Sequence, residues 1–114
     1  MPKPSKDPIG VKSIEWAAGL FEGEGWLHQK KGKPHLWQLG VRMTDKDVLE
    51  SIHAIMGVGY LRGPFKGAKD HYKNNYTWRV YTTADIFKVI CEFYPYMGER
   101  RRAKFDEFLT TYGN

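Results

Sequence analysis

The stretch of sequence that decides the fold runs from residue 16 to residue 25 and reads Trp16-Ala17-Ala18-Gly19-Leu20-Phe21-Glu22-Gly23-Glu24-Gly25. Its small and apolar residues predict a helix that begins after Ser13 and ends near Gly23. Gly19 and Gly23 lie four residues apart on that helix, although a helical glycine costs about 1 kcal/mol relative to alanine. This spacing indicates that another backbone comes very close, either within the chain or from a second copy across a two-fold axis.

Two acidic residues close this helix. Glu22 and Glu24 lie at its C-terminal end, where the helix dipole is negative. A carboxylate in that position is disfavoured by a few tenths to about 1 kcal/mol. An acid kept in an unfavourable place favours a bound cation. The alternative interpretation is that both are ordinary surface glutamates, which are common in proteins.

The rest of the chain alternates between strand and helix patterns. Strands are predicted at residues 26–30 and 36–43, joined by a turn at 31–34, and at residues 58–62 and 76–81. Helices are predicted from Thr44 to Gly57, from Thr82 or Thr83 to Pro95, and over residues 99–112. Four antiparallel strands with helices against one face make an α+β fold. Residues 1–12 are expected to be a flexible basic leader, followed by a single domain over residues 13–114.

The composition favours a nucleic-acid partner. The chain of 114 residues has a formal net charge of +5 and a pI near 9.3, above the threshold of about 9 that marks many nucleic-acid-binding domains. No run of about eighteen apolar residues occurs, so no membrane partner is expected. The single cysteine, Cys91, indicates a reducing compartment and is expected to be buried. We expect a cytoplasmic or nucleoid-associated location, or an organellar one if the gene is organellar, and no secretion.

The stretch at residues 16–25 resembles the LAGLIDADG motif of homing endonucleases. Ala17 stands for the first Leu of the motif and Phe21 for its Ile. Glu22 and Glu24 stand for its two Asp residues, and Gly23 for the Ala between them. The order of helices and hairpins and the segment Gly57-Val58-Gly59-Tyr60 are also similar to that family, and the resemblance covers about residues 13 to 110.

This resemblance implies an αββαββα fold with a four-stranded antiparallel, saddle-shaped sheet. It also implies a site-specific DNA endonuclease, a divalent-metal-dependent phosphodiester hydrolase encoded in a mobile genetic element such as an intron. Because the chain holds one copy of the motif, the resemblance implies a homodimer that makes a double-strand break at a long, near-palindromic DNA site. The alternative is an RNA-binding maturase, with intron RNA as its partner, or a catalytically inactive DNA-binding protein of the same fold.

The resemblance assigns roles to the matched residues. Glu24 would bind the catalytic Mg²⁺, with Mn²⁺ as the alternative, and the carbonyl of Gly23 would join it. The chain departs from the motif because both acids are Glu rather than Asp, but a glutamate is still a suitable hard oxygen ligand for Mg²⁺. The residues expected at the dimer interface are Ala18, Gly19, Glu22 and Gly23.

Alternate residues of the strands form a polar face that the resemblance places along the major groove of DNA. Arginine, asparagine and glutamine are the side chains that read guanine and adenine there. The alternative is that any solvated strand face carries such residues. The candidate DNA-binding residues are His28, Lys30, Gln38, Arg42, Tyr60, Arg62, Asn75, Thr77 and Arg79.

Two further positions are candidates for catalysis. Asp45 follows the second strand, where relatives carry a polar residue that positions water, although an acid at a helix start also favours the dipole. The run Glu99-Arg100-Arg101-Arg102 opens the last helix, and the resemblance implies a basic catalytic residue there. Arg100 and Arg101 are both candidates, because the sequence does not fix which one faces the site. The alternatives are a phosphate contact without catalysis or a solvated charge run.

Overall fold

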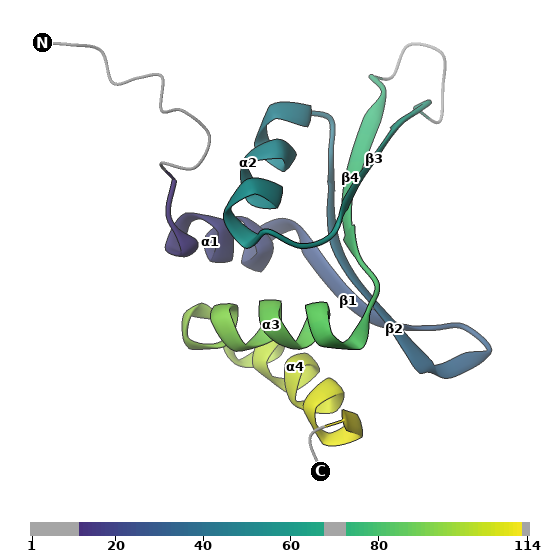
Figure 1. Cartoon of the computed structure of the whole chain (residues 1–114), viewed down its shortest axis with the longest axis vertical. Helices are drawn as coiled ribbons and strands as arrows, with labels where there is room; N and C mark the ends of the chain where they lie inside the picture. Colours follow the sequence, from purple (N-terminus) through teal and green to yellow (C-terminus); the bar gives the residue numbers. More distant parts are fainter. Residues whose placement is uncertain (1–11, 68–72, 113–114) are drawn as a thin grey trace, which may run out of the picture.

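The computed structural model describes residues 12–67 and 73–112, except for the side chains of residues 34 and 35. Most of the predicted leader, residues 1–11, therefore lies outside the described residues. The elements in chain order are α1 (Ile14–Glu24), β1 (Gly25–Lys30), β2 (Lys33–Met43), α2 (Lys46–Met56), β3 (Tyr60–Phe65), β4 (Asn75–Val80), α3 (Thr83–Phe93), the short 3₁₀ helix η1 (Tyr94–Tyr96) and α4 (Glu99–Tyr112). The predicted α+β order is confirmed (Figure 1).

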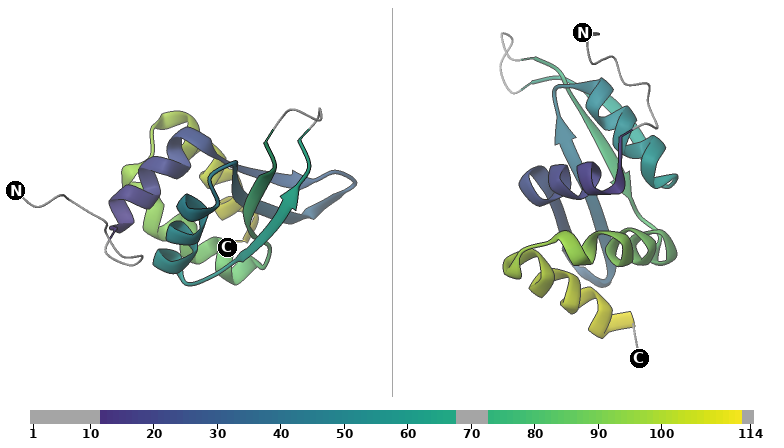
Figure 2. Two further views of the ribbon diagram at one scale, coloured as in Figure 1. Left: turned by 90° about the horizontal axis from the view of Figure 1, so that it is seen from above. Right: turned by 90° about the vertical axis from the view of Figure 1, so that its left-hand side faces the viewer.

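The four strands form one antiparallel sheet in the order β1-β2-β4-β3. Figure 1 shows all four α-helices on one side of this sheet, and Figure 2 shows the same arrangement from two further sides. The ends of the two hairpins point away from each other in Figure 1. Because no described helix covers the second face, one side of the sheet is open.

The core lies between the sheet and the helices. Trp37, Leu39 and Val41 of β2 are buried on the helix side, which confirms the predicted alternation along this strand. Trp78 of β4 is fully buried, and its indole Nε1 donates to the carbonyl of Val58 at 2.9 Å. These alternate burials fix which strand residues face the helices and which face outward.

Aromatic rings connect α1 to the last two helices. Phe21 of α1 is fully buried, with its ring centroid 5.5 Å from that of Phe93 and 5.8 Å from that of Phe105. Burying one such side chain contributes about 1.5–3 kcal/mol. This contact anchors the C-terminal end of α1 against α3 and α4.

Three local predictions were wrong. Thr44 does not cap α2; Asp45 is its N-cap residue, and its side chain makes no capping hydrogen bond. The first turn is shorter than predicted because β2 begins at Lys33, and Gly32 takes a positive φ of 79°. Cys91 is exposed on α3 rather than buried, because its side chain lies outside the stripe that packs on the core.

Within residues 12–67 and 73–112, no helix is both long and apolar enough to cross a bilayer.

The caps of the helices yield a stability prediction. The hydroxyl of Thr82 accepts a hydrogen bond from the backbone N–H of Asp85 at 3.2 Å. Thr82→Ala should therefore lower the free energy of unfolding by about 1 kcal/mol. Thr44→Ala, at the position where the structure shows no cap, should change it by less than about 0.5 kcal/mol. Urea unfolding measures both, and equal losses for the two variants would contradict this reading of the caps.

Candidate functional site

The C-terminal end of α1 runs directly into the sheet. Glu24 is the last residue of the helix, and Gly25 is the first residue of β1. A Cβ on Gly25 would overlap the ring of Phe21, so this junction requires glycine. Glu24 is exposed, and within the described residues its carboxylate has no hydrogen-bond or ion-pair partner. The junction therefore presents a free carboxylate from a fixed backbone.

Glu22, the first acid of the motif, is bound within the chain. Its Oε1 accepts a hydrogen bond at 2.6 Å from the backbone N–H of Gly98, the residue before α4. Its Oε2 lies 3.9 Å from Nε of Arg101. Glu22 therefore ties the end of α1 to the beginning of α4, where the dipole of α4 favours a negative charge. The two acids of the motif have different surroundings.

Arg101 contacts the same end of α1 through its guanidinium group. Its Nη2 donates to the carbonyl of Glu22 at 3.4 Å and also to the carbonyl of Gly25. Its Cζ lies 5.1 Å from the ring centroid of Phe21. Because α1 has no basic residue in its own last turn, Arg101 is the cation that compensates the negative end of this helix.

The electrostatics of Arg101 follow from this position. Burial, and then the charge of neighbouring Arg100, lowers the pKa of Arg101, while Glu22 raises it in part. An arginine stays protonated at neutral pH despite such shifts. The guanidinium of Arg101 is thus occupied by backbone carbonyls, whereas Arg100 is exposed. Of the two predicted basic residues, Arg100 is therefore the more accessible one.

One face of α1 has no partner within the described chain. Gly19 and Gly23 are exposed, and a Cβ built on either residue would meet no described atom within 4 Å. Within the described residues, neither glycine therefore makes the tight contact inside the chain that was the alternative. Ala18 was expected on the same interface, but it is fully buried in the core of its own chain, because it lies on the side of α1 that faces the sheet.

The open face of the sheet carries most of the predicted DNA-binding residues. Directly opposed residues in antiparallel strands point to the same face. His28 pairs with Gln38, and Arg42 pairs with Thr77, which pairs with Arg62. Another row runs from Gly40 through Arg79 to Tyr60. Asn75 precedes Thr77 by two residues on β4 and therefore shares its face. Lys30 follows a register shift in β1.

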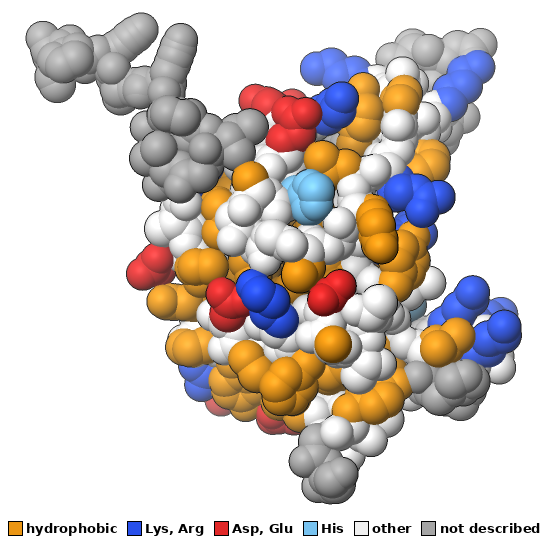
Figure 3. Space-filling model, viewed as in Figure 1, with side chains coloured by type: hydrophobic (Ala, Val, Ile, Leu, Met, Phe, Trp, Pro, Cys, Tyr) orange, Lys and Arg blue, Asp and Glu red, His pale blue; other side chains and the backbone are white. Residues whose placement is uncertain are grey.

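Exposure on this face is uneven. Thr77 is fully buried, so in this conformation its side chain does not reach a partner on the open face. Its hydroxyl has no hydrogen-bond partner among the described residues. Tyr60 remains 59% exposed, and Arg42 and Arg62 are also exposed. The accessible candidates on this face also include His28 and Lys30 of β1. Figure 3 shows Lys and Arg side chains at both hairpin ends and also over the helices, where the visible Asp and Glu side chains lie.

The remaining candidates are not joined to Glu24. Asp45 is exposed at the start of α2, and no hydrogen bond or ion pair links it to Glu24 in the described part of the chain.

Arg100 lines a pocket of about 420 Å³ between β1 and α4 with His28 and Lys104. No three His, Cys, Asp or Glu side chains among residues 12–67 and 73–112 come together as a metal site.

Sequence reasoning missed Trp26 and Lys104, which line the same pocket as Arg100. Trp26 is two residues after Glu24, and the alternation that indicated His28 also assigns Trp26 to the open face. Lys104 lies one helical turn after Arg100 on α4, a spacing that places both residues on one side of that helix.

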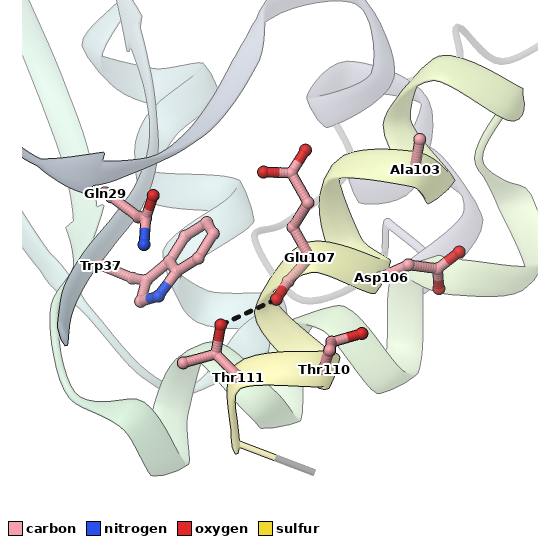
Figure 4. Close-up of a pocket in the computed structure, with 7 residues that line it drawn as sticks. All are labelled: Gln29, Trp37, Ala103, Asp106, Glu107, Thr110 and Thr111. Carbon is pink, nitrogen blue, oxygen red and sulfur yellow. Dashed lines mark hydrogen bonds between the residues drawn. The ribbon is translucent and has the colours of Figure 1, made fainter. Parts of the chain in front are cut away.

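A separate pocket of about 430 Å³ lies between α4 and the first hairpin (Figure 4). Asp106 in its lining accepts a hydrogen bond from the hydroxyl of Tyr94 at 2.9 Å, and this bond raises the pKa of Tyr94. None of the predicted site residues lines this pocket, so it is not part of the candidate site. Its lining residues are Gln29, Trp37, Ala103, Asp106, Glu107, Thr110 and Thr111.

The contacts of Arg101 yield a prediction with a neighbouring control. Arg101→Met removes the donors to the carbonyls of Glu22 and Gly25 and should lower the free energy of unfolding by about 2–3 kcal/mol. Arg100→Met, in the exposed adjacent position, should change it by less than about 0.5 kcal/mol. Urea unfolding measures the free energy of unfolding of both variants. A loss of stability in Arg100→Met but not in Arg101→Met would contradict the contacts assigned to Arg101.

Comparison with solved structures identifies the fold. The chain is similar to the LAGLIDADG meganuclease I-AabMI bound to uncleaved DNA, with a TM-score of 0.70 and 22% identity, over 87% of this chain and 35% of that one. It is similar to the group I intron-encoded homing endonuclease I-CeuI complexed with DNA, with a TM-score of 0.67 and 13% identity, over 93% and 56%. It is also similar to the homing endonuclease I-CvuI in complex with its target in the presence of 2 mM Ca, with a TM-score of 0.63 and 17% identity, over 85% and 63%.

The similarity to these solved structures is a similarity of fold. No protein-family model matches the chain, and the chain spans between 35% and 63% of the length of the three solved chains named above. At sequence identities of 13% to 22%, the shared order of helices and strands is what the comparisons establish. The chain has the LAGLIDADG homing endonuclease fold.

Proposed function

We propose that the chain is a site-specific DNA endonuclease that acts as a homodimer and depends on a divalent metal. The observation that carries this proposal is the end of α1. There an open glycine face at Gly19 and Gly23 adjoins the free carboxylate of Glu24. If two copies pack through this face, their Glu24 residues approach each other. That arrangement fits a reaction on two strands of one duplex.

The solved structures support this proposal in two ways. I-AabMI, I-CeuI and I-CvuI carry the same fold and were each solved with DNA. The chain matches 35% of I-AabMI, so that longer chain has room for two units of this size. Pairing two copies of the present chain would produce a comparable assembly with a two-fold axis, which favours a near-palindromic target.

The chemistry of Glu24 fits a divalent metal. A single chain offers the Glu24 carboxylate and the nearby carbonyl of Gly23, and Mg²⁺ commonly binds one or two carboxylates together with waters and substrate phosphates. Phosphate oxygens of bound DNA and the second copy can complete such a set. When bound, Mg²⁺ or Mn²⁺ would neutralise charge on the phosphate and lower the pKa of water. Asp45 and Arg100 are proposed to position water and to contact the phosphate.

The open face of the sheet is the proposed DNA surface. Antiparallel strands enter the major groove, where every base pair presents its own pattern of donors and acceptors. Arg42 and Arg62 are exposed on this face, and the formal net charge of +5 attracts a polyanion. Binding should therefore weaken steeply as the salt concentration rises.

Glu24→Gln tests the catalytic proposal. The substitution keeps the shape of the side chain and removes its charge, so cutting should fall by more than about a hundredfold, beyond the loss typical of outer-shell partners of a metal. Cut ends are sequenced after incubation of a randomised duplex library with Mg²⁺, and binding is measured with Ca²⁺. Glu15→Gln, an exposed acid in the first turn of α1, is the control and should cut like the wild type.

Two results would contradict the catalytic proposal. If Glu24→Gln cuts as fast as the wild type, Glu24 is not the metal acid. If the wild type binds one DNA site but cuts it with neither Mg²⁺ nor Mn²⁺, the chain is a DNA-binding protein of this fold rather than an endonuclease.

Gly19→Leu tests the homodimer. Because a Cβ on Gly19 meets no described atom within 4 Å, the larger side chain should leave the fold of one copy intact and block close approach of a second. The wild type should sediment as a dimer and Gly19→Leu as a folded monomer. Ala54→Leu, at an exposed position of α2, is the control and should remain a dimer. A wild type that is monomeric at all concentrations, with and without DNA, contradicts the proposal.

A further inference from the structure

Trp26 lies on the open face of the sheet and has no role in the function proposed above. Trp26 of β1 pairs with Gly40 of β2, Gly40 pairs with Arg79 of β4, and Arg79 pairs with Tyr60 of β3. These four residues form one row across the whole sheet. Opposed residues share a face, and Leu27, Trp78 and Val80, beside them in the sequence, are buried on the other face.

Gly40 gives the indole of Trp26 its place in this row. A Cβ on Gly40 would lie 3.0 Å from Cζ2 of Trp26, tighter than most real Cβ contacts. It would also overlap the carbonyl oxygen of Trp78. The missing side chain at Gly40 therefore makes room for the Trp26 ring, which reaches over β2 towards β4. This strand position requires glycine because a backbone and a ring approach it closely.

The ring of Trp26 reaches Arg79. The Cζ of Arg79 lies 5.6 Å from the Trp26 ring centroid and 5.9 Å from that of Tyr81, within the range of cation–π attraction. Among the described residues, Nε of Arg79 is buried and has no hydrogen-bond partner. The position of the guanidinium is thus set by two aromatic rings rather than by an acid.

The two rings that contact Arg79, those of Trp26 and Tyr81, also contact other side chains. Trp26 stacks on His28, with ring centroids 5.0 Å apart and planes at 22°. Tyr81 lies 6.0 Å from Tyr60, and its hydroxyl accepts a hydrogen bond from Nη1 of Arg62 at 3.4 Å. Each ring therefore has a partner besides Arg79, and the cluster limits the rotamers of the arginine before any ligand arrives.

We infer that Trp26 and Tyr81 hold Arg79 ready to read a guanine in duplex DNA on the open face, which makes Trp26 a specificity-determining residue. The inference rests on the proposed function, because it needs this face to bind DNA. An arginine pairs with O6 and N7 of guanine through two parallel hydrogen bonds. A guanidinium already fixed in place loses less freedom when it makes them. Trp26 follows Glu24 by two residues, so the guanine lies in the inner part of each half-site.

The stack itself can be tested in the free protein. In ¹⁵N NMR spectra of the wild type, the Nε–H resonance of Arg79, assigned with Arg79→Lys, should be displaced by the ring currents of Trp26 and Tyr81. Trp26→Phe should keep part of this displacement and Trp26→Ala should remove most of it. An Arg79 resonance that is unchanged by Trp26→Ala would overturn the inference without any reference to DNA.

The reading of DNA is tested by selection from a randomised duplex library with Ca²⁺. We expect the wild type to select guanine at one symmetric pair of positions. Trp26→Ala and Arg79→Ala should each weaken that preference by about tenfold, a change that corresponds to the loss of one good base contact. The double variant should be no worse than Arg79→Ala, and Trp26→Phe should retain most of the preference. Thermal unfolding of each variant verifies that it is folded.

A second arginine of the same face provides a matched control. The Cζ of Arg42 lies 5.7 Å from the ring of Phe65, away from Trp26 in the row of Thr77 and Arg62. Arg42→Ala should abolish the preference at the base that Arg42 contacts. Trp26→Ala should therefore leave the preference at that base unchanged. If Trp26→Ala weakens all positions equally, or leaves the Arg79 preference intact, the inference is overturned while the endonuclease proposal stands. If the wild type selects no duplex and instead binds single-stranded RNA through Trp26, both proposals fall.

Discussion

The fold depends on one junction, where α1 ends and β1 begins without a loop. Glu24 belongs to the helix and Gly25 to the strand, so the helix axis and the strand direction are fixed relative to each other. Phe21 secures the junction from the core side, between Phe93 and Phe105. Arg101 secures it through the carbonyls of Glu22 and Gly25. These contacts place the free carboxylate of Glu24 on a rigid support, which the metal-binding role proposed for it requires.

The two acids of the motif illustrate how position separates structure from chemistry. Glu22 accepts the N–H of Gly98 and lies near Arg101, so its charge is used within the chain. Glu24, two residues later, has no such partner in the described part of the chain. On a helix these residues are about 200° apart, which turns one towards α4 and the other outward. The same motif therefore contributes one acid that stabilises the fold and one acid that is exposed and available for the metal-binding role proposed here.

The order of elements was predictable because its signals are local. Alternation in β2, the cap at Thr82 and the αL glycine at Gly57 each depend on residues close in the sequence. The site was less predictable because its contacts join distant residues. Arg101 meets Glu22 across a separation of 79 positions, and no local pattern decides between Arg100 and Arg101 as its partner.

The burial of single residues was equally inaccessible to sequence reasoning. Ala18 turns into the core and Thr77 is covered on the open face, because packing of elements remote in the sequence determines both. Trp26 was overlooked although alternation assigned it to the open face, since an aromatic residue in a short chain is usually taken for core. The position of its ring depends on Gly40, which leaves space for it from a different strand.

Several unfavourable features of the described chain lie on the surfaces that the proposed function uses. Gly19 and Gly23 weaken an exposed helix face by about 1 kcal/mol each relative to alanine, and a Cβ on either would meet no described atom within 4 Å. Among the described residues, three buried polar atoms without a hydrogen-bond partner belong to the open side of β4: Asn75 Oδ1, Thr77 Oγ1 and Arg79 Nε. Two others, Trp37 Nε1 and Arg101 Nε, lie elsewhere. Unpaired buried polar atoms are destabilising. Local inconsistencies of this kind concentrate at functional surfaces, which supports the proposal that the glycine face of α1 and the open face of the sheet each bind a partner.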